Sequence, residues 1–369
     1  MVRNSHWTLL LVVATTLIVY LYSSYQFSGS PPDGRRRAQV SLDSAIPRIL
    51  LWTPFFESHL LWLSSVNETE IPECGRPCHV TYNRQLLSSS DAVVFHFRDL
   101  NLEDMPALRT FSQKWVFWNM EAPPNTPHTY LKTMRSVFNW TMTYRSDSDI
   151  PVPYGVFKSR NSAPSVKPKQ LLEPKKRTAV WAVSNCETHS DREGFVKELQ
   201  RYMDVDVYGQ CGTHVCPKAS HDECFRKFES QYYFWLALEN SLCRDYVTEK
   251  LFSALEHVIV PVVLGSANYS AIAPPHSVID VSSFESARQV AQYLKRVKSD
   301  RQLYEGYLEW KDKYHVVGWS ETFCNLCRKL HSERFKVNSV HDDLWSWWVK
   351  DSECYTWNDE QWRRKQHIT

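Results

Sequence analysis

The sequence predicts an α/β fold in which two Rossmann-like domains face each other across a cleft. Short apolar runs typical of buried strands alternate with amphipathic helical stretches in both halves of the chain. A basic, proline-rich stretch without periodicity, residues 157–177, separates the halves as an inter-domain linker would. The chain has 369 residues, which is enough for two such domains.

The first 47 residues differ in composition from the rest. An apolar run at residues 7–24 follows a short tail, residues 1–6, and predicts a transmembrane signal anchor, although its apolar core is slightly shorter than the roughly 20 residues that span a bilayer comfortably. A cleaved signal peptide is the competing interpretation, but no convincing small-x-small cleavage site follows the run. Residues 25–47 are rich in Ser and Pro and predict a flexible stem.

Counting positive charges on either side of the apolar run does not decide the orientation of this anchor. All ten cysteines lie after it, as do three glycosylation sequons, and both features are typical of an oxidising, extracytoplasmic compartment. The sequons are at Asn67, Asn139 and Asn268. We therefore expect a single-pass type II membrane protein whose larger part is lumenal.

Overall charge and glycine content exclude several classes of function. The formal net charge is only +2, so the sequence gives no electrostatic reason to expect a nucleic-acid partner. Only ten glycines are present, and no G-x-G-x-x-G or Walker A motif occurs among them. A dinucleotide-dependent dehydrogenase and a P-loop enzyme are therefore disfavoured.

In the first half, apolar runs at residues 49–56, 92–97 and 114–120 predict buried strands. Glu121 follows the third run, where a pair of prolines must turn the chain. A carboxylate at the end of a buried strand, surrounded by aromatic side chains, can work as a general base. A strand-terminal glutamate in a surface turn is the plainer alternative.

In the second half, residues 178–185 and 204–209 predict strands on either side of a helix at residues 192–203. Arg192 begins this helix after a strand, which is a position from which a cation reaches a phosphate; a solvated helix-end arginine is the alternative. Phe284 to Lys298 predicts another amphipathic helix.

Residues 232–264 are the most informative segment. A strand from Tyr232 to Leu238, a helix from 248 to 257 and a strand from 258 to 264 form a βαβ unit, whose ligand site lies beyond the carboxyl end of the first strand. Thr248 can cap the helix and leave Glu249 and Lys250 in its first turn, where N–H groups and the dipole favour an anion. Lys250 adds a positive charge, and Glu249 can accept hydrogen bonds from ribose hydroxyls. This pattern predicts a nucleotide-diphosphate site without a glycine-rich loop. Asn240, at the end of the first strand, can orient the nucleotide or have a structural role.

Three segments of the chain resemble the α-1,3-fucosyltransferases of glycosyltransferase family 10. ENSLCRDYVTEKLFSAL, at 239–255, is similar to the donor-binding signature of that family. FNWTMTYRSDSDIPVPYG, at 138–155, resembles a second hallmark segment, and CHVTYNRQLLSSSDAVVFHFRDL, at 78–100, fits the early catalytic pattern. The resemblance covers roughly residues 48–350.

This resemblance implies a GT-B-like fold with an acceptor-side domain at 48–156, a GDP-fucose-binding domain at 178–345 and a tail at 346–369 that packs on the catalytic part. It implies an inverting enzyme of the Golgi membrane that transfers L-fucose from GDP-β-L-fucose to the 3-hydroxyl of GlcNAc in N-glycans or other glycoconjugates. No bound cofactor is implied, and Mn²⁺ is expected to be at most stimulatory. The expected donor-binding residues are Arg192, Asn240, Tyr246, Glu249 and Lys250.

Glu121 corresponds to the glutamate that the resembling family uses as the base. One departure concerns the position four residues later, where the family usually has His and this chain has Asn125. This difference supports an alternative function, a catalytically inactive paralogue that acts as a lumenal glycan-binding protein. The chain also mixes features of enzymes that modify the innermost GlcNAc of N-glycans with features of Lewis-type enzymes that modify outer antennae, and we favour the first type.

Two further motifs have structural alternatives. Asp147-Ser148-Asp149 could bind Mn²⁺, but hard-cation sites need more oxygen ligands, and the resemblance implies no catalytic metal. Cys324-Asn-Leu-Cys327 could be half of a zinc site, but no second C-x-x-C completes it. The resemblance instead implies disulfides between Cys74 and Cys78 on one side and Cys324 and Cys327 on the other, in an order that it leaves open.

Overall fold

The computed structural model describes residues 46–57, 68–70, 74–162, 164, 175–216, 221–318, 322–333, 336 and 339–357. The expected tail and membrane anchor at residues 1–24, nearly all of the expected stem, and the sequon at Asn67 lie outside the described residues. Among the helices that are described, none has both the length and the apolar character needed to cross a membrane.

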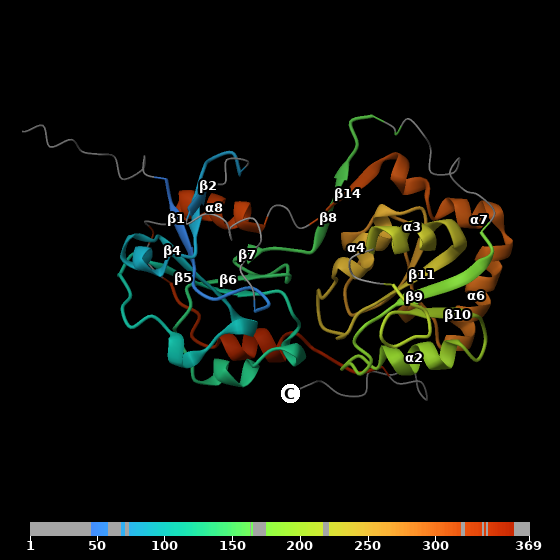
Figure 1. Ribbon diagram of the computed structural model, residues 1–369, viewed down its shortest axis with the longest axis horizontal. Coiled ribbons are helices and arrows are strands. Elements are labelled where there is room, and N and C mark those ends of the chain that lie inside the picture. The colour runs from blue at the N-terminus through green and yellow to red at the C-terminus, as the bar shows by residue number, and fades with distance from the viewer. Residues whose placement is uncertain are drawn as a thin grey trace, which may run out of the picture. The chain divides into compact units, whose positions relative to one another are not determined.

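The first sheet contains, within the described part of the chain, seven strands in the order β2-β3-β1-β4-β5-β6-β7 (Figure 1). Neighbouring strands are parallel except for the edge pair β2 and β3. The strands are β1 (Arg48–Leu51), β2 (Glu68–Glu70), β3 (His79–Thr81), β4 (Ala92–His96), β5 (Lys114–Asn119), β6 (Trp140–Thr143) and β7 (Ile150–Pro151). Every residue of β4 and β5 is buried, as expected for an interior parallel sheet that is covered on both faces.

Among the described residues, the loops of this first region contain five short 3₁₀ helices. They are η3 (Arg84–Ser89), η4 (Phe97–Asp99), η5 (Leu102–Asp104), η6 (Pro123–Asn125) and η7 (His128–Lys132). The helix η6 begins at the proline pair after β5, because a proline tolerates the first turn of a helix but cannot continue a strand.

The second sheet has the strand order β10-β9-β11-β12-β13 among the described residues, and all of its strands are parallel. Its strands are β9 (Arg177–Ala182), β10 (Val205–Tyr208), β11 (Tyr232–Leu238), β12 (Val260–Leu264) and β13 (Ile279–Asp280). Numbered along the chain, this order is 2-1-3-4-5, which is a doubly wound topology. The prediction of an α/β fold is confirmed, and within the described residues the two large sheets are parallel apart from the pair β2 and β3.

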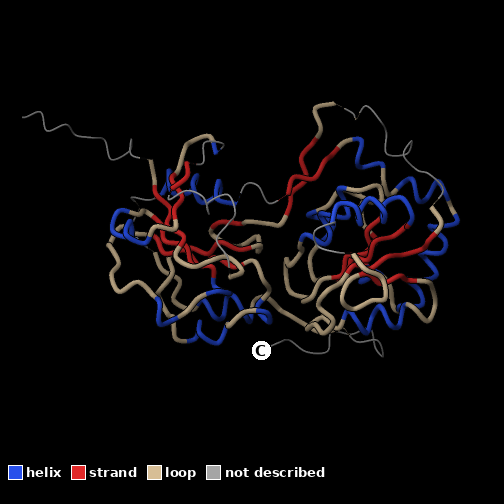
Figure 2. The backbone as a smooth tube through the Cα atoms, in the orientation of Figure 1, coloured by secondary structure: helices blue, strands red, loops and turns tan. Residues whose placement is uncertain are grey.

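Helices cover both faces of the second sheet (Figure 2). On one face lie α2 (Arg192–Leu199), α6 (Ala287–Ser299) and α7 (Arg301–Gly306), and on the other lie α3 (His221–Gln231) and α4 (Glu249–Glu256). The short helices α5 (Tyr269–Ile272), η10 (Val281–Ser283) and η11 (Glu309–Asp312) complete this region. The predicted helix 248–257 agrees with α4 to within one residue at each end. The helix predicted from Phe284 begins three residues later, at Ala287, because Ser286 caps it.

A third, two-stranded sheet lies where the linker was expected. The strand β8 (Gly155–Ser159) pairs antiparallel with β14 (Tyr314–Gly318). The expected linker, residues 157–177, therefore begins inside a strand and ends at the first residue of β9, which is a correction to the prediction. The sequence could not show this, because the pairing partner of β8 lies far later in the chain.

The last part of the chain returns to the core of the first sheet. Phe323, Leu326 and Leu330 of α8 (Thr322–Glu333) pack there, and so does Trp348 of the π-helical turn η13 (Ser346–Lys350). This packing differs from the expected GDP-fucose-binding domain at 178–345, which included α8. The disulfides Cys74–Cys324 and Cys78–Cys327 join this helix to the segment before β3 and supply the connectivity that the resemblance left open.

Candidate active site

A cavity of about 350 Å³ lies at the carboxyl ends of β9, β10 and β11. In a doubly wound sheet, ligands bind where the strand order reverses, and here this point lies between β9 and β11. The cavity is lined by residues that follow these strands, such as Asn185 and Gly209, and by the first turn of α4. It brings together four of the five predicted donor-binding residues, which are Arg192, Asn240, Glu249 and Lys250.

Lys250 is held in this cavity by three oxygen-bearing neighbours. Its ammonium group donates to Thr248 Oγ1 at 2.7 Å and to Glu249 Oε1 at 3.0 Å, and it lies 3.2 Å from Glu239 Oε2. Burial alone would lower the pKa of Lys250, but the two carboxylates outweigh this effect and raise the pKa. Lys250 therefore stays a cation at the wall of the cavity.

Glu239 is the functional neighbour that sequence reasoning missed. Its side chain is only 1% exposed. Its carboxylate accepts hydrogen bonds from the backbone N–H of Thr248 at 2.8 Å and from the Thr248 hydroxyl. It therefore fixes the start of α4 as well as pairing with Lys250. The available signal was its place directly after an apolar strand, because a carboxylate buried there needs donors and a counter-charge.

Arg192 is buried, with 4% of its surface exposed. Its guanidinium donates to the carbonyl of Leu238 at 2.9 Å and to the carbonyl of Asn185 at 3.1 Å. These carbonyls belong to the two chain segments that leave the sheet at the reversal of strand order. The alternative of a solvated helix-end arginine is therefore wrong, and Arg192 places a fixed positive charge at the cavity.

Asn240 lines the same cavity with an unused acceptor. Its Oδ1 atom is buried and has no hydrogen-bond partner within the described part of the chain. A buried amide oxygen without a donor is costly, so a hydroxyl or an N–H group that a ligand placed against it would offset this cost.

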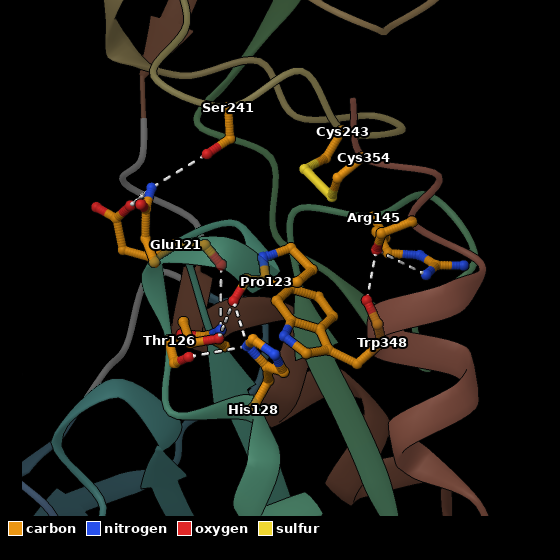
Figure 3. Close-up of a disulfide and its surroundings, with 12 residues drawn as sticks. Glu121, Pro123, Thr126, His128, Arg145, Ser241, Cys243, Trp348 and Cys354 are labelled. Atoms are coloured by element: carbon orange, nitrogen blue, oxygen red, sulfur yellow. Dashed lines mark hydrogen bonds between the residues drawn. A yellow bond between two sulfur atoms is a disulfide. The ribbon is translucent and has the colours of Figure 1, made fainter. Parts of the chain in front are cut away.

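Glu121 lies two residues beyond β5 and is half-buried. Its Oε2 atom accepts hydrogen bonds from the Tyr246 hydroxyl at 3.2 Å and from Asn125 Nδ2 at 3.3 Å. The side chain of Asn119 donates to the Glu121 carbonyl at 3.1 Å and so holds the backbone. Figure 3 shows this carboxylate near Ser241, to which the same Asn125 amide also donates at 3.3 Å.

Tyr246 was predicted to belong to the donor-binding group, but it lies beside Glu121 rather than in the lining of the cavity. Its ring packs against Tyr144 with the ring centroids 4.9 Å apart. Burial raises the pKa of Tyr246 well above its ordinary value, so the hydroxyl stays protonated and donates to Glu121. Tyr246 thus connects the candidate base to the loop between β11 and α4.

The two carboxylates of the D-x-D motif have structural partners. Asp147 accepts hydrogen bonds from Arg145 at 2.9 and 2.7 Å and lies 3.5 Å from Arg244. Asp149 accepts from the backbone N–H and the hydroxyl of Thr141, both at 2.8 Å. Both oxygens of Asp147 and the Oδ2 atom of Asp149 are thus engaged by protein groups, and these contacts order the loop that carries the motif.

The predicted glycosylation sites differ in accessibility. Asn139 is 2% exposed; its Oδ1 accepts from the Trp115 N–H at 2.7 Å, and its Nδ2 donates to the Ser339 carbonyl at 2.8 Å. A glycan on this nitrogen would have to displace a buried contact, so the structure corrects the expectation for Asn139. Asn268 is exposed directly before α5, and its glycosylation stays a prediction.

The sequence and the fold are similar to those of known proteins of one family. Residues 44–155 match the family model "Fucosyltransferase, N-terminal", and residues 172–347 match "Glycosyltransferase family 10 (fucosyltransferase) C-term". The chain is 40% identical over 331 residues to alpha-(1,3)-fucosyltransferase C of Drosophila melanogaster, which covers 81% of this chain and 77% of that protein. It is 36% identical over 355 residues to alpha-(1,3)-fucosyltransferase 7 of Rattus norvegicus, which covers 94% of this chain and 89% of that protein. A solved structure described as an alpha1,3-fucosyltransferase with GDP-fucose has a similar fold, with a TM-score of 0.53 and 18% identity over 81% of this chain and 94% of that one. The chain therefore belongs to glycosyltransferase family 10, the fucosyltransferases.

Proposed function

We propose that the protein is an inverting α-1,3-fucosyltransferase that transfers L-fucose from GDP-β-L-fucose to the 3-hydroxyl of GlcNAc in N-glycans or other glycoconjugates. The names of the two relatives above support this reaction, and a solved enzyme of similar fold is described with GDP-fucose. We also propose the GT-B arrangement, in which the acceptor and the donor meet between the two parallel sheets.

One observation carries the proposal. The Glu121 carboxylate is hydrogen-bonded to Tyr246, and Tyr246 belongs to the loop that leads from Asn240 to Lys250 at the cavity. A candidate base is thus tied directly to the segment that presents the candidate diphosphate-binding cation. Inverting transfer needs such a neighbour, because the acceptor must attack the sugar from the face opposite to the leaving nucleotide.

In the proposed reaction, Glu121 takes the proton of the acceptor hydroxyl as its oxygen forms a bond to the anomeric carbon of fucose. The bond from that carbon to the β-phosphate breaks, and its electron pair leaves with GDP. Attack from the opposite face converts the β-linked donor into an α-linked product.

The leaving GDP gains negative charge at its diphosphate, and the cavity offers matching groups. Lys250, Arg192 and the N–H groups at the start of α4 would stabilise this charge. Glu249 and the unpaired Oδ1 of Asn240 would accept hydrogen bonds from the ribose hydroxyls or the base.

Two acceptor positions follow from different observations. The later cysteines and the LWSWW segment resemble enzymes that modify the innermost GlcNAc of N-glycans, and we propose this position first. The segment RSDSDIPVPYG resembles Lewis-type enzymes, and a Homo sapiens relative, 36% identical over 336 residues, is named a 3-galactosyl-N-acetylglucosaminide 4-alpha-L-fucosyltransferase. An antennal GlcNAc is therefore the second candidate.

The test is transfer from GDP-fucose by the purified full chain to N-glycopeptides and to N-acetyllactosamine, with the product linkage determined by mass spectrometry and NMR. We expect an α-1,3-linked fucose on GlcNAc from the wild type and none from Glu121→Gln, which should still fold and bind GDP. Absence of transfer to every acceptor by a wild-type chain that binds GDP would favour the inactive, glycan-binding paralogue.

We propose further that the protein is a type II protein of the Golgi membrane. Five disulfides use all ten cysteines of the chain, which supports an oxidising compartment. Protease treatment of sealed Golgi vesicles should leave the catalytic part intact, and its digestion without detergent would reject this orientation.

A further inference from the structure

We infer that Asn125 is a positioning residue for Glu121, which holds one carboxylate oxygen and links it to the donor-side loop without adding a titratable group. This inference rests on the proposed function, because it assigns Asn125 a role in a reaction in which Glu121 is the base.

The backbone around Asn125 is fixed on both sides of the residue. It ends the helix η6, where its N–H donates to the Ala122 carbonyl at 2.9 Å. Its own carbonyl accepts a hydrogen bond from Arg98 Nη1 at 3.2 Å. The side chain therefore starts from a defined position, which a residue that orients another group requires.

The side-chain amide then spans two segments that are distant in sequence. Its Nδ2 atom carries two hydrogens, and it donates to Glu121 Oε2 and to Ser241 Oγ, each at 3.3 Å. Ser241, labelled in Figure 3, is completely buried. It directly follows Asn240, beyond the end of β11. One amide thus joins the candidate base to the loop that lines the donor cavity.

These contacts distinguish the two oxygens of the Glu121 carboxylate. Among the described residues, its hydrogen-bond donors, Tyr246 and Asn125, both act on Oε2. This leaves Oε1 to receive the proton of an acceptor hydroxyl. Both donors are neutral, so they orient the carboxylate without placing a positive charge beside it.

A histidine at this position would behave differently. A neutral imidazole has one N–H donor, so it cannot donate to Glu121 and to Ser241 at the same time. A protonated imidazole has two donors, but it would add a positive charge beside the base and would titrate between about pH 5 and 8. Asn125 supplies two donors and does not change charge with pH. We therefore expect a single ionisation in the fall of kcat/KM at low pH, which is the acid limb of the pH profile.

The experiment measures kcat/KM against pH for the wild type, Asn125→Ala, Asn125→His and Ser241→Ala. Loss of one neutral hydrogen bond to the charged form of Glu121 should move the acid limb of Asn125→Ala upward by about half a pH unit. Its kcat should fall while GDP affinity stays unchanged. Asn125→His should show a second ionisation on the same limb.

Ser241→Ala is the matched control, because it removes the cross-link and keeps the bond to Glu121. Its acid limb should stay at the wild-type pH while kcat falls. Thermal unfolding and GDP binding of every variant identify any general misfolding. If Asn125→Ala fails to fold, Asn125→Asp replaces it, and a carboxylate next to Glu121 should raise the acid limb by more than about one pH unit.

An unchanged acid limb in a folded Asn125→Ala or Asn125→Asp variant would overturn the inference and leave the proposed reaction standing, provided that Glu121→Gln is inactive. Full activity of Glu121→Gln, or absence of transfer by the wild type, would instead overturn the proposed function and this inference with it.

Discussion

Replacing Lys250 with methionine should lower both the stability of the protein and its affinity for GDP, but through different partners. Within the protein, the lysine neutralises Glu239, a carboxylate with 1% of its side chain exposed, at a distance of 3.2 Å. In the proposed complex, it binds the diphosphate of the donor. A second substitution, Glu239→Gln, should separate these two effects.

The loss of stability in Lys250→Met depends on the hydrogen bonds that Glu239 retains. Removing one partner of a buried ion pair costs about 3–5 kcal/mol, because the other charge stays buried. Glu239 retains the backbone N–H and the hydroxyl of Thr248 as donors, so we expect the lower end, about 3 kcal/mol. For a chain of 369 residues, with an unfolding entropy of about 2.1 cal/mol/K per residue, this loss corresponds to a fall in Tm on the order of 4 °C.

The size of the second effect follows from the charge of Lys250. A hydrogen bond to a charged group contributes about 1.5–3 kcal/mol, so GDP should bind about 10- to 150-fold more weakly to Lys250→Met. In the double variant with Glu239→Gln, the neutral amide removes the uncompensated charge. Stability should then largely return, whereas GDP affinity should not.

Thermal unfolding and titration calorimetry with GDP measure the two quantities in the same samples. A double variant that stays as unstable as Lys250→Met would refute the argument from the buried charge of Glu239. Normal GDP affinity in either variant would remove Lys250 from the donor site. Arg301→Met is the control, because Arg301 is 80% exposed and pairs with Glu305 on the surface, and its loss should cause no measurable change.

Three further predictions concern other parts of the molecule. Replacing both Cys243 and Cys354 by alanine opens a loop closed over a separation of 111 residues and should lower the free energy of unfolding by about 4 kcal/mol, measured by thermal or chemical unfolding. Burial lowers the pKa of Lys175 from 10.5 to about 7, so its contribution to stability is fully present above about pH 10.5 and is lost as the pH falls through about 7. The free energy of unfolding should therefore rise by up to about 1.4 kcal/mol per pH unit from pH 7 to pH 9, and Tm should rise with it. Lys175→Met should lose part of this rise. Exhaustive treatment with EDTA should leave most of the transfer activity, because side-chain cations meet the diphosphate in the proposed site.

Each of these predictions has a clear contrary result. An unchanged unfolding midpoint in the double alanine variant would mean that the Cys243–Cys354 link does not constrain the unfolded chain. A Tm profile of Lys175→Met that is parallel to that of the wild type would show that this lysine is not buried as a neutral group. Complete loss of transfer after EDTA treatment, restored by Mn²⁺, would require a metal ion in the reaction.

The sequence predicted correctly those elements whose formation depends on residues that are close together in the chain. The strand β11 has the predicted bounds, Tyr232–Leu238, and α4 begins directly after its predicted cap, Thr248. Both depend on apolar periodicity and on a capping side chain, which are properties of a few consecutive residues. The approach of Arg192, Asn240 and Lys250 to one cavity follows from the same logic, because the carboxyl ends of parallel strands share one edge of a sheet.

Contacts between distant residues were the features that escaped prediction. The strand β8 runs into the start of a basic, proline-rich stretch and escaped prediction because its partner, β14, lies about 150 residues later in the chain. The sequon at Asn139 satisfies a local motif, but its amide is used by Trp115 and Ser339. Tyr246 was predicted to bind the donor, but its hydroxyl donates to Glu121, which belongs to the region of the first sheet.

The return of α8 to the core of the first sheet affects the order in which the protein can be completed during synthesis. The strands β9 to β13 lie within one continuous stretch, so this region can fold as soon as its own residues have left the ribosome. The first region cannot, because its disulfide partners Cys324 and Cys327 are made about 250 residues after Cys74 and Cys78. The apolar core of the first sheet therefore stays incomplete until α8, near the end of the chain, has been synthesised. Premature release of a truncated chain would leave a first region that lacks α8, even though every described strand of its sheet has been synthesised.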